Sequence, residues 1–271
     1  MILIGERINA TRKSIKTAIQ NQDTGTIQAE ITRQDTAGAT YIDLNAGTGA
    51  GDMDQEARDL CWLIDIALET TDKKLVLDAA SPAVLKKAVE HLGERRAFMI
   101  NSVKGDFSTT MKEIMDLAAG QEAPLIALAM DEDGIPSSTE KRLEICSAIR
   151  KEAQSRGIPD KHLFFDPLVL PISADISQGM VTFTTISGIK EMYPEAKTTM
   201  GLSNVSHGLK ERLKINSTFL SIAIAYGLDS AICDPGKVSI RRAAVLGELI
   251  AGKDRHCRKF SRAYRGGLFN D

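Results

Sequence analysis

The chain has 271 residues, of which 43% are hydrophobic and 26% are charged, and these ordinary globular proportions exclude a disordered or fibrous protein. Its 34 Lys and Arg residues nearly balance 36 Asp and Glu residues, so no nucleic-acid-binding surface is expected. The start of the chain lacks the pattern of a signal peptide and no long apolar run follows, so we expect neither export nor a membrane span.

Short apolar runs rich in β-branched residues alternate with segments of helical period along the chain, which is typical of βα units around a parallel sheet. The eight predicted strands are Ile2–Ile8, Tyr41–Asn45, Leu75–Asp78, Ala97–Asn101, Leu125–Ala129, Leu163–Asp166, Thr198–Gly201 and Ser230–Cys233. Because no Pro-, Ser- or charge-rich linker interrupts them, the sequence predicts a single (β/α)8 TIM barrel domain over residues 1–271.

The segments between the strands place apolar residues at the i, i+3, i+4, i+7 spacing of a helix with one buried face. Three clear sets are Leu60, Leu63, Ile64 and Ala67; Leu85, Ala88, Val89 and Leu92; and Met111, Ile114, Met115 and Ala118. Ser81 before Pro82 predicts a helix start, and Gly93 predicts the end of that helix. Ser137 and Glu140 predict a capping box at the start of a later helix.

An open doubly wound sheet is the competing fold, but its phosphate fingerprint GxGxxG does not follow the first strand. The glycine-rich segment Gly47–Gly51 is a weak match that lacks the Walker lysine. The four cysteines lie far apart without a CxxC pair, which predicts reduced thiols and a cytoplasmic protein.

In a barrel, the residues that close the strands build the active site. Here these residues are carboxylates and amides: Asn9, Asp43, Asn45, Asp78, Asn101, Asp166, Asn204 and Asp234. Each one alone fits a turn or a helix cap as well, but so many at one barrel end indicate a binding site. No His stands at a strand end, which disfavours a zinc hydrolase, so no bound metal is expected, although Mg²⁺ on the carboxylates stays open.

This set of side chains suits a flat heterocycle with adjacent hydrogen-bond donors and acceptors. A carboxylate accepts two parallel N–H bonds, whereas an amide offers one donor group and one acceptor. The 2-amino-4-oxo edge of a pterin has that pattern.

Several motifs in chain order resemble those of the pterin-binding methyltransferases. They are Gly5-Glu-Arg-Ile-Asn9, Asp43-Leu-Asn45-Ala-Gly47, Leu77-Asp78, Ile100-Asn101-Ser102, Phe165-Asp166-Pro-Leu168, Gly201-Leu-Ser-Asn-Val-Ser206 and Ile215-Asn216. Methyltetrahydrofolate:corrinoid protein methyltransferases are the nearest in pattern. The folate module of cobalamin-dependent methionine synthase and dihydropteroate synthase are more distant.

The resemblance implies that Asp78, Asn101 and Asp166 hold the pterin. It also implies that Asn204 hydrogen-bonds N5 of the folate and is the catalytic residue. The supporting residues would be Glu6, Asn9, Asp43, Asn45 and Ser203. The substrate would be tetrahydrofolate or methyltetrahydrofolate, the partner a separate protein carrying cobalamin (a corrinoid), and the chain a homodimer.

Two other functions stay open: a dihydropteroate synthase-like enzyme and a non-catalytic folate-binding subunit. The direction of methyl transfer stays open as well. The basic residues near the C-terminus indicate a solvated face, with contact to a partner or to the glutamate tail of folate as alternatives. These residues are Lys253, Arg255, Arg258, Lys259, Arg262 and Arg265.

Overall fold

The computed structural model describes residues 1–48 and 52–270. Its strands are β1 (Ile2–Asn9), β2 (Tyr41–Asn45), β3 (Lys74–Asp78), β4 (Phe98–Lys104), β5 (Leu125–Leu128), β6 (Leu163–Asp166), β7 (Lys197–Thr198) and β8 (Ser230–Cys233). Its helices are α1 (Lys13–Gln20), α2 (Thr24–Thr36), α3 (Met53–Thr70), α4 (Pro82–Leu92), α5 (Thr109–Gly120), α6 (Thr139–Ser155), α7 (Gln178–Met192), α8 (Arg212–Ala225), α9 (Val238–Ile250) and α10 (Arg258–Arg265).

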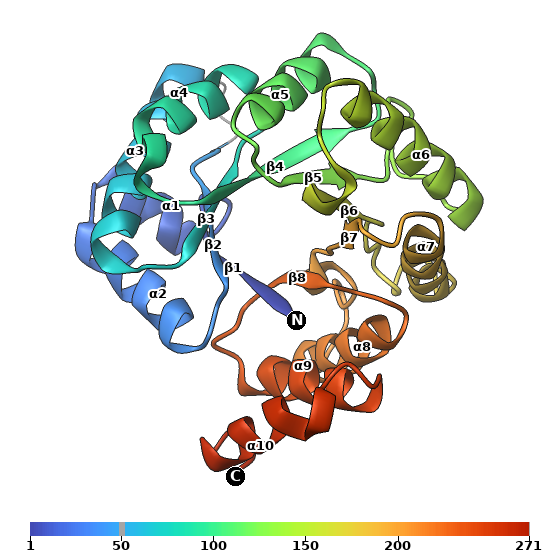
Figure 1. Cartoon of the computed structure of the whole chain (residues 1–271). Coiled ribbons are helices and arrows are strands. Elements are labelled where there is room, and N and C mark those ends of the chain that lie inside the picture. Colours follow the sequence, from blue (N-terminus) through green and yellow to red (C-terminus); the bar gives the residue numbers. More distant parts are fainter. Residues whose placement is uncertain (49–51, 271) are drawn as a thin grey trace.

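All strand pairs are parallel, and the strands follow the order β7-β6-β5-β4-β3-β2-β1-β8. The last seam is closed by a bridge between Gly201 and Ile232, where the Ile232 amide donates to the Met200 carbonyl over 2.8 Å. The helices surround the ring of strands (Figure 1). The predicted (β/α)8 barrel is therefore confirmed.

Two buried layers follow from the alternation of side chains along each strand. Inside the barrel, one residue from each of six strands packs into an apolar cluster, namely Ile4, Tyr41, Val76, Met99, Ile126 and Phe164. Outside, a larger cluster joins the strands to the helices and contains all three predicted apolar stripes. The helical stripes of the sequence are thus confirmed as the faces that cover the sheet.

Some element ends differ from the sequence prediction. The seventh strand ends at Thr198, since the chain next forms only the bridge at Gly201 before a 3₁₀ turn over Leu202–Asn204. The predicted capping box is wrong: the cap of α6 is Ser138, whose Oγ accepts from the Lys141 amide over 3.3 Å. Extended backbone at Ser138 places the hydroxyl there, one residue later than predicted.

The predicted first residue and the predicted end of α4 are confirmed. Pro82 opens the helix and Gly93, at φ +55°, follows its last residue, although Ser81 makes no capping hydrogen bond with its side chain. Residues 49–51 of the glycine-rich segment lie outside the described residues. In the described part of the chain, no helix is both long and apolar enough to cross a membrane.

Candidate active site

A row of polar side chains crosses four neighbouring strands at their carboxyl ends. Asn9 of β1 pairs in register with Asn45 of β2, which pairs with Asp78 of β3, which pairs with Asn101 of β4. Residues in register on adjacent parallel strands are nearest neighbours on the same face of the sheet. The structure therefore brings together four of the predicted site residues.

The polar row lies at the open end of the barrel, which we call the mouth. Two residues before Asn45 and on the same face, Asp43 stands one layer deeper and is only 2% exposed. Asp166 closes β6 in register with Leu128 of β5, and β6 stands across the ring from β2. The apolar cluster inside the barrel lies beneath these polar side chains, so the mouth is polar around its rim and apolar at its base.

Burial shapes the charge state of these carboxyls. It raises the pKa of Asp78 to about 6, against an opposing hydrogen bond from the Asn45 side chain. It likewise raises the pKa of Asp166 to about 6, against hydrogen bonds from the backbone of Leu168 and Gly201. Burial next to Asp78 raises the pKa of Asp43 well above its ordinary value. Carboxyls held this way are typical of a binding or catalytic site.

The loop after β6 is held by an arginine that sequence reasoning missed. Arg142 of α6 is fully buried, and its Nη1 donates to the carbonyls of Pro167 and Leu168 over 2.8 and 2.9 Å. This fixes the loop whose Leu168 amide donates to Asp166 Oδ1 over 2.7 Å. The sequence contained one signal that Arg142 is buried: it precedes the buried Ile145 and Cys146 by one helical turn and so lies on the same face of α6.

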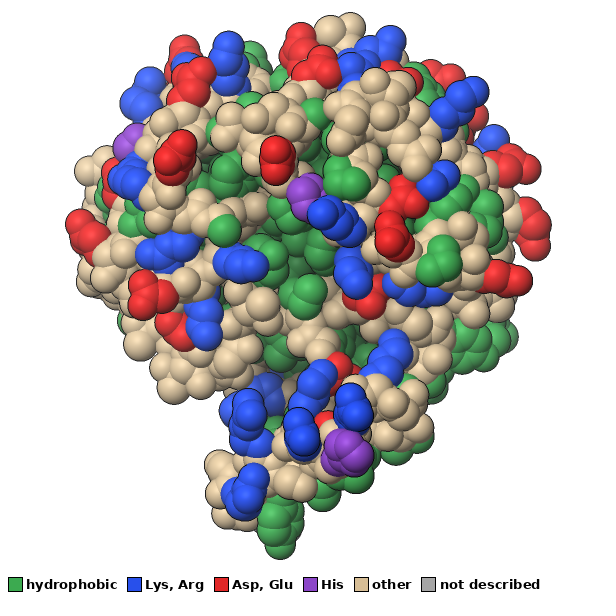
Figure 2. Space-filling model, viewed as in Figure 1, with side chains coloured by type: hydrophobic (Ala, Val, Ile, Leu, Met, Phe, Trp, Pro, Cys, Tyr) green, Lys and Arg blue, Asp and Glu red, His purple; other side chains and the backbone are tan. Residues whose placement is uncertain are grey.

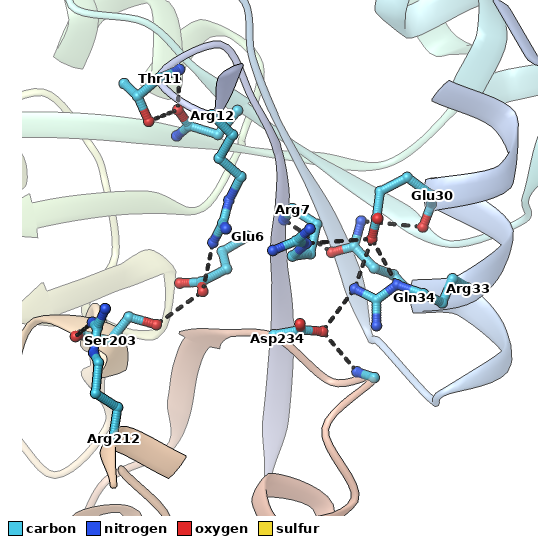
Figure 3. Close-up of polar contacts among 12 residues, drawn as sticks. Glu6, Arg7, Thr11, Arg12, Glu30, Arg33, Gln34, Ser203, Arg212 and Asp234 are labelled. Atoms are coloured by element: carbon cyan, nitrogen blue, oxygen red, sulfur yellow. Dashed lines mark hydrogen bonds and ion pairs between the residues drawn. The ribbon is translucent and has the colours of Figure 1, made fainter. Parts of the chain in front are cut away.

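A second network ties β1 to the turn after β7. Glu6 Oε1 accepts from Arg12 Nη2 over 3.0 Å and from Ser203 Oγ over 2.9 Å (Figure 3). Arg212 of α8 donates to the Ser203 carbonyl over 2.7 Å and so fixes the same turn. Burial raises the pKa of Glu6, opposed by Ser203 and Arg12. The predicted supporting residues Glu6 and Ser203 are therefore direct partners.

Asn204 ends the 3₁₀ turn and is exposed at the mouth. Its side-chain amide has no hydrogen-bond partner among residues 1–48 and 52–270, so it is available to a ligand. Gly201 leaves room for it, because a Cβ there would lie 3.1 Å from Asn204 Nδ2.

The two outer amides serve the loops at least in part. Asn9 Oδ1 accepts from the Thr11 amide over 2.9 Å, and Asn45 Oδ1 accepts from the Gly47 amide over 3.0 Å. Asp234, at the end of β8, pairs with Arg33 Nη2 at 2.8 Å and so differs from the unpaired carboxyls at the other strand ends. No group of three or more His, Cys, Asp or Glu side chains suited to a metal ion occurs in the described ranges.

The family of pterin-binding enzymes has a sequence model that matches residues 5–234. The chain belongs to this family. The matched span begins at Gly5 and ends at Asp234, directly after β8, so it includes every side chain of the polar row.

Among curated relatives of this pterin-binding enzyme is the methylcorrinoid:tetrahydrofolate methyltransferase of Eubacterium limosum. It is 34% identical over 269 residues, which cover 98% of this chain and 97% of that protein. The methionine synthase of Mycobacterium tuberculosis is 31% identical over 254 residues, but these cover 88% of this chain and only 21% of the synthase.

Among solved structures, the dihydropteroate synthase of Clostridium difficile, determined in the presence of pteroic acid, superposes with a TM-score of 0.72. The alignment covers 92% of this chain and 96% of that one at 18% identity. The dihydropteroate synthase of Yersinia pestis gives a TM-score of 0.69 at 15% identity, covering 93% of each chain. These two likenesses establish the barrel fold.

Proposed function

We propose that the protein transfers a methyl group from a corrinoid, carried by a separate protein, to N5 of tetrahydrofolate. The observation that carries the proposal is the near-full-length similarity to the Eubacterium limosum methyltransferase, at 34% identity. The direction of transfer follows that relative's name. The polar mouth supports the proposal, since its hydrogen-bond donors and acceptors suit a pterin.

In this proposal, Asp78, Asn101 and Asp166 hold the pterin ring. A carboxylate accepts two parallel N–H bonds, as the amino edge of the ring presents, and the Asn101 amide offers both a donor and an acceptor. With pKa values of about 6, Asp78 and Asp166 are mainly ionised at neutral pH and therefore act as acceptors. Asp43 lies one layer beneath these three residues, and its buried Oδ1 has no hydrogen-bond partner. We assign to it a supporting role for the residues that hold the pterin ring.

In this reaction the Co–C bond of the methylated corrinoid would break with both bonding electrons kept by cobalt, and the N5 lone pair would form the new N–C bond. The N5 proton would pass to water. We assign to Asn204 the hydrogen bond that orients N5, because its side-chain amide is exposed at the mouth without a partner in the described chain. Most of the acceleration would come from holding N5 in line with the methyl group and from preorganised dipoles.

The test begins with anaerobic calorimetric titration of the purified protein with tetrahydrofolate. Micromolar binding, about 8 kcal/mol, is expected. Methylcobalamin is then added in place of the unidentified partner protein, and formation of methyltetrahydrofolate is followed. Binding without methyl transfer, repeated with several corrinoid proteins, would favour a non-catalytic subunit. Product formed from a pterin pyrophosphate and p-aminobenzoate would instead favour a dihydropteroate synthase.

We further propose that the protein is a homodimer. A groove of about 490 Å³ between α7 and α8 is lined mainly by apolar side chains. Ile176 on its rim is 90% exposed and Met180 is 53% exposed, so a second copy would cover apolar surface that is costly in water. Sedimentation should give a dimer that Ile176→Asp with Met180→Asp converts to a monomer. A wild-type monomer at micromolar concentration would contradict the proposal.

A cytoplasmic location is proposed as well. It is supported by the free state of Cys61, Cys146, Cys233 and Cys257 in the structure, because thiols persist in reducing compartments.

A further inference from the structure

A second pocket lies at the mouth beside the pterin site, between β1, β8 and the start of α8. It has a volume of about 220 Å³. Its charged lining consists of Glu6, Arg7, Arg12, Arg212, Asp234 and Lys237. Figure 3 shows Glu6 and Arg12 meeting on one side of β1 near Ser203, while Arg7 and Asp234 are directed to the other side, toward Glu30 and Arg33. None of the charged lining side chains has a role in the function proposed above, although Glu6 is one of the supporting residues that the resemblance implies.

The pocket holds more positive than negative charge. Each of its two carboxylates is already paired, Glu6 with Arg12 at 3.0 Å and Asp234 with Arg33 at 2.8 Å. Arg212 bonds only neutral oxygens, the Ser203 carbonyl and Ser206 Oγ. Lys237 has no ion pair or side-chain hydrogen bond in the described part of the chain. Two cations therefore lack an acidic partner.

Two buried polar atoms of the lining also lack hydrogen-bond partners. Asn216, which is only 7% exposed, has an Oδ1 atom without a donor. The Nε of Arg7 has no acceptor in hydrogen-bond range and stands 3.7 Å from Glu30. Buried polar groups are normally satisfied, so the Asn216 oxygen indicates a ligand that brings an N–H donor, whereas Arg7 Nε is directed to its ion-pair partner Glu30.

We propose that this pocket binds the γ-glutamyl tail of the folate substrate, an inference that rests on the proposed function. The tail carries carboxylates for Arg212 and Lys237, and its amide N–H groups suit Asn216 Oδ1. The geometry of folate supports the path, because the side chain leaves the pterin at the carbon next to N5. Asn204, assigned to N5, directly follows Ser203, which lines the pocket.

The basic C-terminal residues do not reach this pocket. Lys259 donates to Glu248 over 2.6 Å, and Glu248 also pairs with the amino group of Met1. Met1 precedes β1, so this cluster lies at the end of the barrel where the strands begin. Figure 2 shows the basic side chains gathered over this C-terminal segment. The glutamate tail is therefore assigned to the pocket at the mouth and not to the C-terminus.

The test compares three probes by anaerobic titration: tetrahydropteroate, which lacks glutamate, tetrahydrofolate with one glutamate, and tetrahydropteroyl triglutamate. For the wild type, the triglutamate should bind at least about tenfold more tightly than tetrahydropteroate, with an advantage that shrinks as salt is added. Lys237→Gln should weaken triglutamate binding about three- to fivefold and leave tetrahydropteroate unchanged.

Lys210→Gln is the matched control, because it removes an exposed charge at the same end of the barrel outside the pocket lining. Arg212→Gln should act like Lys237→Gln, but it also frees Ser203, so Lys237 gives the cleaner result. Equal wild-type affinity for the three probes would overturn the inference, as would equal weakening of tetrahydropteroate by Lys237→Gln. Failure of all three probes to bind would overturn the proposed function together with this inference.

Discussion

Three carboxyls inside the mouth differ from the charged groups at the other end of the barrel, because they have no ion-pair partner. Where the strands begin, these charged groups are paired. Arg150 donates two hydrogen bonds of 2.8 Å to the two carboxylate oxygens of Asp160, and Lys190 pairs with Asp229 at 3.1 Å. At the mouth, Asp43, Asp78 and Asp166 form no ion pair with any described residue. The first arrangement stabilises the fold, whereas the second leaves groups for a ligand.

A similar difference holds for some individual hydrogen-bonding groups. Thr198, the second residue of the two-residue β7, donates its backbone amide to Asp229 just before β8 over 3.0 Å, so this backbone group is satisfied by a side chain. At the mouth, Asp43 Oδ1 and Asn216 Oδ1 are buried without partners. A protein of marginal stability tolerates such groups mainly where they serve function, so substitutions at the two ends should have different consequences.

The largest effect is expected at the mouth, from Asn204→Ala. Losing one preorganised hydrogen bond to the reacting atom should lower kcat for methyl transfer about 10²- to 10³-fold, while the Kd for tetrahydrofolate changes little. Single-turnover kinetics with methylcobalamin and titration of the same preparation separate the two quantities. Equal losses in binding and transfer would show that Asn204 serves only to bind.

The next effect is a loss of binding from Asp166→Ala. The pterin N–H groups would be left without an acceptor in a buried site, so the Kd for tetrahydrofolate should rise about 30- to 300-fold, or about 2–3 kcal/mol. Asp166→Asn keeps the acceptor for the Leu168 amide and should show a smaller loss. If Asp166→Ala bound tetrahydrofolate normally, the pterin would lie elsewhere in the barrel.

At the other end, Asp229→Ala should affect stability and leave catalysis intact. It removes the partner of Lys190 Nζ and of the Thr198 amide, so the free energy of unfolding should fall by about 2 kcal/mol. Thermal unfolding monitored by fluorescence tests this, with Asp166→Ala as the comparison. A variant with normal melting temperature but impaired folate binding would contradict the division between the two ends.

The spacing of apolar residues along the sequence predicted much of this architecture. Uninterrupted apolar runs are typical of strands buried on both faces, and stripes such as Leu60, Leu63 and Ile64 give helices one buried face. Element ends were less certain, because a shift of one residue, as from Ser137 to Ser138, hardly changes the local pattern.

The contacts between segments far apart in the sequence could not be predicted from the spacing of apolar residues. Glu6 and Ser203 are separated by 197 positions, and only closure of the barrel brings them within 2.9 Å. Arg142 was overlooked for a related reason: a charge on an apolar stripe is satisfied by the carbonyls of a loop that the sequence does not locate. The position of the C-terminal basic residues likewise follows from tertiary packing.

The carboxyls at the mouth also predict a pH dependence of stability. A native pKa of about 6 for Asp78 and Asp166 lies above the ordinary value, so the native state binds protons more readily than the unfolded state. Stability without ligand should therefore be lost as pH rises from about 4 through 6, by about 1–3 kcal/mol per carboxyl.

Binding should change in the opposite direction. In the proposed site the ionised carboxylates accept hydrogen bonds from the pterin, so tetrahydrofolate affinity should increase over the same pH range. Denaturant unfolding of the wild type and of Asp78→Asn with Asp166→Asn at several pH values isolates the contribution of these groups. If the difference in unfolding free energy between the two proteins stayed constant with pH, the carboxyls would titrate normally.

The smallest effect is expected from the basic C-terminal segment, through Arg262→Gln with Arg265→Gln. Both side chains belong to α10, which packs on the outer side of α9 and starts where Lys259 joins Glu248, outside the lining of the pocket at the mouth. At that distance and at physiological salt, screening leaves little interaction with a folate in the mouth, so the Kd should change by less than about twofold. Titration with tetrahydropteroyl triglutamate is the most sensitive check, since it carries the most negative charge. A loss of more than about fivefold would place the glutamate tail near α10 and contradict the assignment to the pocket at Lys237.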